Sequence, residues 1–191
     1  MTEYRIAATL KEKEEIYKLR YRVFCQEKQW LNQNDYPDGK EIDEYDEHSV
    51  HFLAQKADEI VGTTRIIFPS DLDLPIVKNF EITISDHVER YVELSRLVVA
   101  KKVRGLEVIV GLLCSVLDWG LSEGITHGYA IVEEKLIRFL ARLGYPFHKL
   151  GQGKVYFGAY TIPTCAVLAE LSKTLQTLTL KRDFPVEIFI P

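Results

Sequence analysis

An acid, a hydroxyl and a guanidinium follow one another closely in a stretch that otherwise indicates a buried strand. Glu93, Ser95 and Arg96 lie within Tyr91–Gly105, whose first half is rich in valine and leucine, as is typical of strands. An unpaired charge in a desolvated setting is unfavourable by on the order of several kcal/mol. This strand therefore either carries a fully partnered ion network or lines a cleft that uses the charges.

The alternation of a strand decides which of these side chains share a face. Successive side chains point to opposite faces, so one face would carry Glu93, Ser95, Leu97 and Val99. Arg96 belongs to the other face unless a bulge interrupts the strand. The pattern leaves both arrangements open.

A basic turn follows the strand and precedes a long apolar run. The turn consists of Lys101, Lys102, Arg104 and Gly105. A basic, glycine-ended turn at a helix start is typical of an anion site. The alternative interpretation is a structural salt-bridge strand followed by an ordinary solvated turn. The run itself, Leu106–Leu121, is too short to span a bilayer and indicates a buried helix.

Two arginines in apolar surroundings need partners. Arg20 lies on the apolar stripe of a predicted helix, where it either extends to solvent or reaches an acid supplied from elsewhere. Arg65 lies in a predicted strand. Five acids follow a polar loop: Glu41, Asp43, Glu44, Asp46 and Glu47. Such acidic runs mostly lie exposed to solvent. Arg20 and Arg65, however, have no other acidic partner in the predicted elements, so they are candidate partners for this run.

Composition excludes several classes of protein. The 191 residues suit one domain, 1–191, and the net charge of -4 argues against broad nucleic-acid binding. The cysteines are odd in number and lack ligand spacing, which indicates reduced thiols in a cytoplasmic protein: Cys25, Cys114 and Cys165. The N-terminus shows no hydrophobic signal core, so export is not supported.

No metal site is predicted. The acid run lacks the glycine-centred spacing of a calcium loop. His48 and His51 flank a strand start and have no third ligand at a useful spacing. Both are interpreted as ordinary polar or core histidines.

Periodicity and turn residues predict a mixed sheet with helices on its faces, of the α/β (α+β) class. Strands are expected at Tyr4–Leu10, Ser49–Ala57, Glu59–Phe68, from Tyr91, at Ile125–Val132, within Tyr145–Tyr160 and at Pro185–Ile190. Helices are expected at Lys11–Gln29, Leu106–Glu123, Glu133–Leu143 and Cys165–Leu175. Asn32–Gly39 is expected to be a loop, and Pro69–Asp86 irregular, with Pro69 and Pro75 as breakers.

The element order resembles the fold of the GNAT superfamily of N-acetyltransferases over nearly the whole chain. Within that fold the sequence is similar to the acyl-homoserine lactone (autoinducer) synthases and the long-chain N-acyl amino acid synthases. The residues that carry the resemblance are Leu19-Arg20, Val23-Phe24, Trp30, Gly39 to Asp46 with Asp43 and Asp46, Arg65, and Glu93-Leu94-Ser95-Arg96. The resemblance implies a mostly antiparallel central sheet flanked by helices on both faces.

The resemblance also implies roles in transferring an acyl group from a thioester to an amine. Glu93 would act as the base that deprotonates the amine, with Ser95 and Arg96 as further catalytic residues. Backbone amides would stabilise the oxyanion, from Leu97, Val98 and Val99. The acceptor-binding set would be Arg20, Phe24, Trp30, Asp43, Asp46 and Arg65.

The helix start departs from the pattern of acetyl-coenzyme A users. Glu107 and Ile109 occupy positions where those proteins carry small residues, and a carboxylate there opposes a pyrophosphate. We therefore expect an acyl carrier protein, with its acyl-phosphopantetheine, as donor and no tightly bound cofactor. Its phosphate and acidic surface would meet Lys101, Lys102, Arg104 and Gly105, with Lys135, Arg138 and Lys149 as further candidates.

The acceptor is left open between two chemistries. The stretches Asp46–Phe52 and Leu74–Ile76 look more like the amino acid synthases, which acylate an amino acid such as tyrosine. The alternative is a lactone synthase that uses S-adenosylmethionine. The fatty acyl chain would lie among residues from Leu112 to Leu143. In lactone synthases a threonine on the corresponding strand tends to accompany 3-oxo acyl chains. Ala130 takes that position here, which indicates an unsubstituted chain. Further alternatives are a coenzyme A-dependent GNAT acetyltransferase and a non-catalytic relative that binds an acyl lipid.

Overall fold

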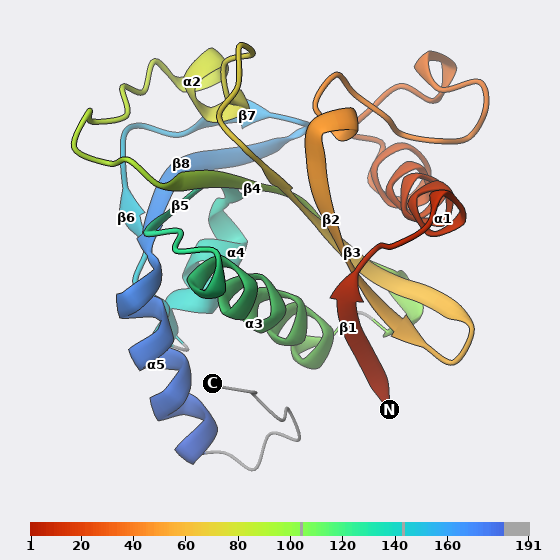
Figure 1. The fold of residues 1–191 in the computed structure, drawn as a ribbon. Coiled ribbons are helices and arrows are strands. Elements are labelled where there is room, and N and C mark those ends of the chain that lie inside the picture. Colours follow the sequence, from red (N-terminus) through yellow and green to blue (C-terminus); the bar gives the residue numbers. More distant parts are fainter. Residues whose placement is uncertain (104, 143, 182–191) are drawn as a thin grey trace. The chain divides into compact units, whose positions relative to one another are not determined.

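In the computed structural model of the chain, the described residues contain one sheet of eight strands, and helices connect several of these strands (Figure 1). The structure describes residues 1–103, 105–142 and 144–181. The chain divides into two compact units. Unit 1 comprises Met1–Ile67 with Ser95–Ser115, and unit 2 comprises Phe68–Leu94 with the chain from Val116 onward. The predicted mixed, mostly antiparallel fold is confirmed, whereas the single domain over 1–191 stays a prediction.

Unit 1 contains three antiparallel strands and the second half of a fourth. The strands are β1 (Thr2–Ile6), β2 (Ser49–Lys56), β3 (Glu59–Ile67) and β4 (Tyr91–Val99). β1 pairs with β2 and β2 pairs with β3, both antiparallel, and β4 is the next strand in the sheet. The β2–β3 pair confirms the hairpin predicted from the two alternating runs.

The first strand lies earlier in the chain than predicted, because a helix cap intervenes. The Thr9 hydroxyl accepts a hydrogen bond from the backbone N–H of Glu12 at 3.2 Å, and the Glu12 carboxylate accepts from the N–H of Thr9 at 2.9 Å. This capping box starts α1 (Leu10–Tyr21) at Leu10. The prediction of a strand over Tyr4–Leu10 is therefore wrong at its C-terminal end.

α1 continues into a π-helical segment, Arg22–Glu27. There the N–H of Lys28 donates to the carbonyl of Val23, five residues earlier, at 2.9 Å. The segment keeps the predicted apolar stripe on one side, in a buried cluster of Leu19, Val23, Phe24, Cys25, Val98 and Ala100. The helix predicted over Lys11–Gln29 is confirmed, and its π-helical part is a feature that periodicity did not reveal.

Helix α3 (Leu106–Ser122) approaches the strands of unit 1 at two glycines. A Cβ atom at Gly62 on β3 would lie 2.9 Å from Cγ1 of Val108. A Cβ atom at Gly111 would lie 2.2 Å from Cζ of the Tyr4 ring on β1. The first turns of α3 therefore pack directly onto β1 and β3, at a distance that only glycine permits.

Unit 2 is built around the first half of β4. β4 pairs in parallel with β5 (His127–Glu133) as far as Leu94, which lies opposite Ala130. β5 pairs antiparallel with β8 (Ala159–Val167), and β8 also carries β6 (His148–Lys149) and β7 (Lys154–Tyr156). The helices are α2 (Pro75–Phe80), α4 (Glu134–Arg142) and α5 (Leu168–Lys181).

Two predictions in unit 2 are wrong in part. Pro75 was expected to break structure, but it occupies the first turn of α2, where a missing N–H costs nothing. The helix expected over Cys165–Leu175 is present as α5, but it begins at Leu168, because Cys165 lies in β8 opposite Tyr129 of β5. Pro163 is tolerated in that strand because it lies opposite the interruption between β6 and β7, where few ladder bonds are made.

The remaining described elements are short 3-10 turns at Gln33–Asp35, Asp46–His48 and Lys101–Val103. The final strand predicted at Pro185–Ile190 lies outside the described residues. Within the described part of the chain, no helix combines the length and the apolar character needed to cross a membrane.

We predict that Gly111→Ala lowers the free energy of unfolding by about 1–3 kcal/mol, because the added methyl group overlaps the ring of Tyr4, which must then leave its packed position and its hydrogen bond to the Glu107 carbonyl. Urea denaturation measures the change. Gly105→Ala is the matched control, since its Cβ atom would meet only the Val103 carbonyl at 3.8 Å. A Gly111→Ala protein as stable as the wild type would refute the close approach of α3 to β1.

Candidate functional site

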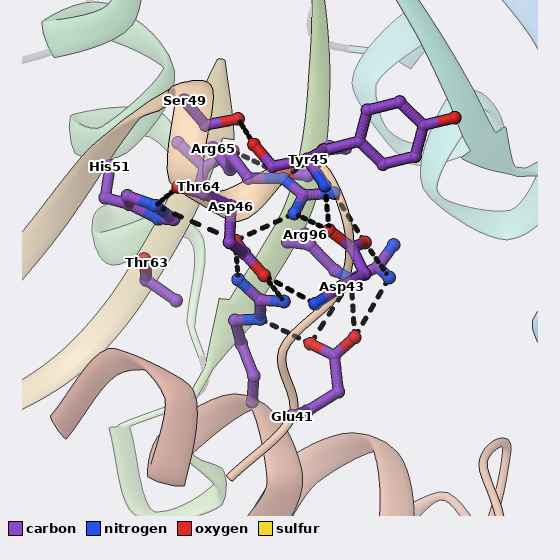
Figure 2. Close-up of polar contacts among 12 residues, drawn as sticks. Glu41, Asp43, Tyr45, Asp46, Ser49, His51, Thr63, Thr64, Arg65 and Arg96 are labelled. Atoms are coloured by element: carbon purple, nitrogen blue, oxygen red, sulfur yellow. Dashed lines mark hydrogen bonds and ion pairs between the residues drawn. The ribbon is translucent and has the colours of Figure 1, made fainter. Parts of the chain in front are cut away.

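Three arginines and three acids of unit 1 form a closed ring of alternating charges (Figure 2). Each arginine contacts two acids and each acid contacts two arginines. In order around the ring the residues are Arg20, Glu41, Arg96, Asp43, Arg65 and Asp46, which returns to Arg20. The formal charges of the ring cancel. We call this set the charge ring.

The ring is held by short, paired hydrogen bonds. Arg20 donates to both carboxylate oxygens of Asp46, at 2.6 and 2.9 Å, and its Nε donates to Glu41. Arg65 donates through both terminal nitrogens to Asp43, at 2.5 and 2.9 Å, and Arg96 reaches Asp43 at 2.7 Å. Two-pronged bonds between guanidinium and carboxylate are the strongest of the charge-assisted class.

Four separate elements contribute to the ring. Arg20 comes from the last turn of α1, Arg65 from β3 and Arg96 from β4. The acids all come from the connection that leads into β2. The ring therefore ties this connection, residues 41–46, to one helix and two strands. The acid run is the partner of Arg20, which does not extend to solvent.

Arg96 reaches the ring because the backbone of β4 departs from regular strand geometry. Its φ of 56° lies in the left-handed region that side-chain-bearing residues seldom adopt. Regular alternation would send Ser95 and Arg96 to opposite faces. Instead the Ser95 hydroxyl accepts from Nε of Arg65 at 3.1 Å while Arg96 bonds Glu41 at 3.0 Å. The irregularity thus directs two consecutive side chains to one charge cluster.

The charge ring is largely buried, so each of its ionised side chains needs opposite charges beside it to compensate for the loss of water. Arg20 and Glu41 are 0% exposed and Asp46 is 2% exposed. Burial alone would raise the pKa of Asp46, but the hydrogen bonds and charge of Arg20, together with the charge of Arg65, hold that pKa below its usual range. Burial also opposes ionisation of Asp43, and Arg65 and Arg96 lower its pKa. Asp43 and Asp46 are therefore ionised at neutral pH.

His51 lies behind the ring as a buried, neutral imidazole. Its Nε2 is 3.3 Å from the main-chain carbonyl of Asp46, and its ring meets Tyr17 edge to face at 5.6 Å. Burial lowers the pKa of His51 to about 4, although the nearby Asp46 charge acts in the opposite direction. Nδ1 has no hydrogen-bond partner among the described residues. The interpretation of His51 as a core histidine agrees with this geometry.

An aromatic pair lies beside the ring. Phe24 and Trp30 stack with their ring centroids 6.1 Å apart, and the Arg96 guanidinium lies 5.9 Å from the centroid of Phe24. The π-helical segment makes this possible, because the N–H of Trp30 then donates to the carbonyl of Phe24 at 2.8 Å. The structure thus brings the predicted residues Phe24 and Trp30 together with Arg96.

Glu93 belongs to unit 2, where it is almost completely buried at 1% exposure. One carboxylate oxygen accepts a hydrogen bond from the backbone N–H of Ile76 in α2 at 2.9 Å. The three predicted oxyanion residues follow on β4 in unit 1. Leu97 is half-buried, and Val98 and Val99 are buried.

The predicted basic turn is only partly described. Lys101 and Lys102 are exposed in a 3-10 turn, and Lys102 pairs with the Glu59 carboxylate. Gly105 is exposed, while Arg104 lies outside the described residues. In unit 2, Lys135, Arg138 and Lys149 are exposed, and Arg138 pairs with Glu134 at 3.2 Å.

Sequence reasoning missed the role of Glu41. Only Asp43 and Asp46 were assigned to the site, although two carboxylates cannot balance three buried guanidiniums. Charge counting over Arg20, Arg65 and Arg96 could have revealed the third acid. Among the described residues, no cluster of three or more histidine, cysteine or acidic side chains is arranged to hold a metal ion.

Comparisons with known proteins agree on one group. Residues 15–170 match the family model described as "N-acyl amino acid synthase FeeM". An acyl-homoserine-lactone synthase of Aliivibrio fischeri is 28% identical over 152 residues, which are 74% of this chain and 77% of the relative.

Two solved structures have the same fold. BjaI, a coenzyme A-dependent acyl-homoserine lactone synthase solved with SAM and isopentyl-CoA, has a TM-score of 0.76 and 24% identity, covering 97% of this chain and 90% of that one. FeeM, an N-acyl amino acid synthase from uncultured soil microbes, has a TM-score of 0.73 and 17% identity, with coverage of 94% and 98%.

We predict that acidification weakens the fold through His51. Its pKa is about 4 in the folded chain and about 6.5 when unfolded. Between these values the unfolded chain binds more protons, so the free energy of unfolding falls as the pH drops from 6.5 to 4, by up to about 3 kcal/mol. Urea denaturation at several pH values measures the slope.

His51→Gln should flatten that slope whatever its effect on stability at pH 7. The exposed His48→Gln is the matched control and should keep the wild-type slope. If His51→Gln and the wild type lose stability in parallel between pH 6.5 and 4, then His51 is not the group responsible.

Proposed function

We propose that this chain, which belongs to the N-acyl amino acid synthase FeeM family, moves a fatty acyl chain from a carrier-protein thioester to the α-amine of an amino acid. The family is one of acyltransferases. The observation that carries the proposal is the match over residues 15–170, a range that includes the whole charge ring and Glu93. Transfer of an acyl group by this family is thus the premise, and the donor and the acceptor are the proposal.

The chemistry requires a neutral amine beside a thioester. Glu93 takes a proton from the α-ammonium group, directly or through water, so that the nitrogen lone pair can attack the thioester carbon. The new C–N bond forms, the C–S bond breaks, and the thiol leaves with a proton. We assign stabilisation of the oxyanion to backbone amides on β4, at Leu97, Val98 and Val99.

The acceptor is proposed to meet the solvent-facing edge of the charge ring. The side chains of Arg96 and Asp43 are 10% and 19% exposed, whereas Arg20 is fully buried. A free amino acid carries a carboxylate and an ammonium, which complement Arg96 and Asp43 respectively. Phe24 and Trp30 supply an apolar wall beside Arg96. Arg20, Asp46 and Arg65 then hold the edge in place, and Ser95 holds Arg65.

A lactone synthase that acylates S-adenosylmethionine is the second candidate. The similarity to the Aliivibrio fischeri synthase favours it. S-adenosylmethionine presents the same α-ammonium and carboxylate, so the same edge of the ring suits either acceptor. Mass spectrometry of lipids from a bacterium that expresses the chain separates an N-acyl amino acid from an acyl lactone.

We favour a carrier protein over coenzyme A as donor, although BjaI uses coenzyme A. Glu107 is exposed in the first turn of α3, where its carboxylate opposes a pyrophosphate. Lysines exposed near β4 and on α4 suit an acidic carrier protein, namely Lys101, Lys102 and Lys135. Coenzyme A thioesters therefore serve as the comparison substrate in each assay.

We predict that Glu93→Gln lowers the turnover number at least about a hundredfold, the scale of general base catalysis, and leaves donor binding nearly unchanged. Amide formation from acyl carrier protein and amino acid, followed by mass spectrometry, measures the rate. Glu89→Gln, an exposed acid on the segment before β4, is the matched control. Undiminished amide formation by Glu93→Gln would remove Glu93 from the mechanism.

We predict that reversing Lys101 and Lys102 to glutamate raises the KM for acyl carrier protein about tenfold or more, because like charges then face each other. Rising salt should raise the wild-type KM in the same direction. The control reverses Lys11 and Lys56, two exposed lysines elsewhere, and changes the net charge equally. Equal KM values for the two double variants would exclude a docking role for the basic turn.

A further inference from the structure

The Pro75–Ile76 peptide group of α2 is bonded at both of its ends. Its N–H end, from Ile76, donates to a carboxylate oxygen of Glu93 at 2.9 Å. Its carbonyl end, from Pro75, accepts a hydrogen bond from Nδ2 of the Asn79 side chain at 2.7 Å. All four residues belong to unit 2. A peptide group is planar, so a bond that fixes the carbonyl also fixes the direction of the N–H.

We propose that Asn79 is a positioning residue for the carboxylate of Glu93, acting through this single peptide group. The inference rests on the proposed function, in which Glu93 is the base. Asn79 does not touch the carboxylate. It orients the donor that does, and a donated bond to the carbonyl also polarises the N–H at the other end, which strengthens the bond to Glu93.

The surroundings of α2 leave this peptide group little freedom. Leu74, Pro75 and Ile76 are buried, so the start of the helix is fixed by packing. At the other end of α2, Phe80 meets the ring of Tyr156 edge to face at 5.9 Å and carries the Lys154 ammonium 4.8 Å above its centroid. The helix is thus anchored at both ends, and the Asn79 bond holds the carbonyl of the peptide group whose N–H donates to Glu93.

Pro75 explains why a side chain is recruited for this purpose. Proline at the first position of a helix fixes φ near -65° and offers no N–H, so Ile76 supplies the donor next to it. The side chain of Asn79, one turn later, returns to the Pro75 carbonyl. Leucine has nearly the same shape as asparagine but no donor, and Asn79→Leu therefore removes the bond with little change in volume.

A double-mutant cycle tests the proposal. Asn79→Leu is expected to lower kcat about tenfold, the scale of one hydrogen bond near a charged group, with KM for either substrate within about twofold. In the Glu93→Gln background the same change should lower the residual kcat less than about twofold. Lys78→Ala, an exposed neighbour on α2, is the matched control and should retain wild-type kcat.

The outcomes distinguish this inference from the proposed function. If Glu93→Gln loses activity but Asn79→Leu keeps wild-type kcat, or lowers kcat equally in both backgrounds, then Asn79 does not act through Glu93. If the wild type forms no N-acyl product, or Glu93→Gln keeps full activity, then the proposed function fails on its own account.

A second measurement does not depend on activity. In ¹⁵N-resolved NMR spectra of the full chain, the Ile76 amide proton is expected at low field and should move upfield in Glu93→Gln, which weakens its acceptor. It should also move upfield in Asn79→Leu, and remain in place in Lys78→Ala. An Ile76 signal that ignores the loss of the Asn79 side chain would overturn the proposed link.

Discussion

The architecture of unit 1 depends on keeping three guanidiniums and three carboxylates in balance in a charge ring that is buried except at the edge formed by Arg96 and Asp43. Each member of the charge ring has two opposite neighbours, so no member can be removed without leaving a buried charge uncompensated. Breaking a buried pair costs about 3–5 kcal/mol, a large part of the stability of a typical domain. The connection at residues 41–46 is therefore ordered by electrostatics, since only Glu41, Tyr45 and Asp46 within it are buried.

The charge ring requires the left-handed backbone of Arg96 in β4, and the contacts of Arg96 in the ring offset the cost of that backbone. A regular strand would turn Arg96 away from Ser95, and the ring would then have one carboxylate too many. The φ of 56° at Arg96 is a local cost, and the two acids that Arg96 reaches offset it. β4 pairs with β5 only as far as Leu94, so the irregularity begins where the parallel ladder ends. The strain therefore lies next to Glu93 in sequence, where the family chemistry is proposed to take place.

Much of this could be foreseen from the residues themselves. The hairpin, the long α1 stripe and the apolar α3 followed from periodicity. Arg20, Arg65 and Arg96 stood out as charges in apolar elements, and the acid run was their candidate partner. The choice of Asp43 and Asp46 within that run came from the family resemblance. What escaped prediction depends on contacts distant in sequence. Glu41 is one of several acids in a run, and only the geometry shows that it bridges Arg20 and Arg96. Cys165 lies in a strand because β5 pairs with it. The hydrogen bond from Asn79 to the Pro75 carbonyl is not indicated by any sequence pattern.

Unit 1 is discontinuous along the chain, because residues 1–67 need Ser95–Ser115 to complete it. During synthesis on the ribosome, the first 67 residues emerge before Arg96, and they carry two arginines of the ring, Arg20 and Arg65, but all three of its acids, a surplus of one negative charge. This negative charge stays unbalanced until Arg96 has left the exit tunnel. The nascent N-terminal half therefore cannot settle into its final form early, and the last cation to be translated completes the ring.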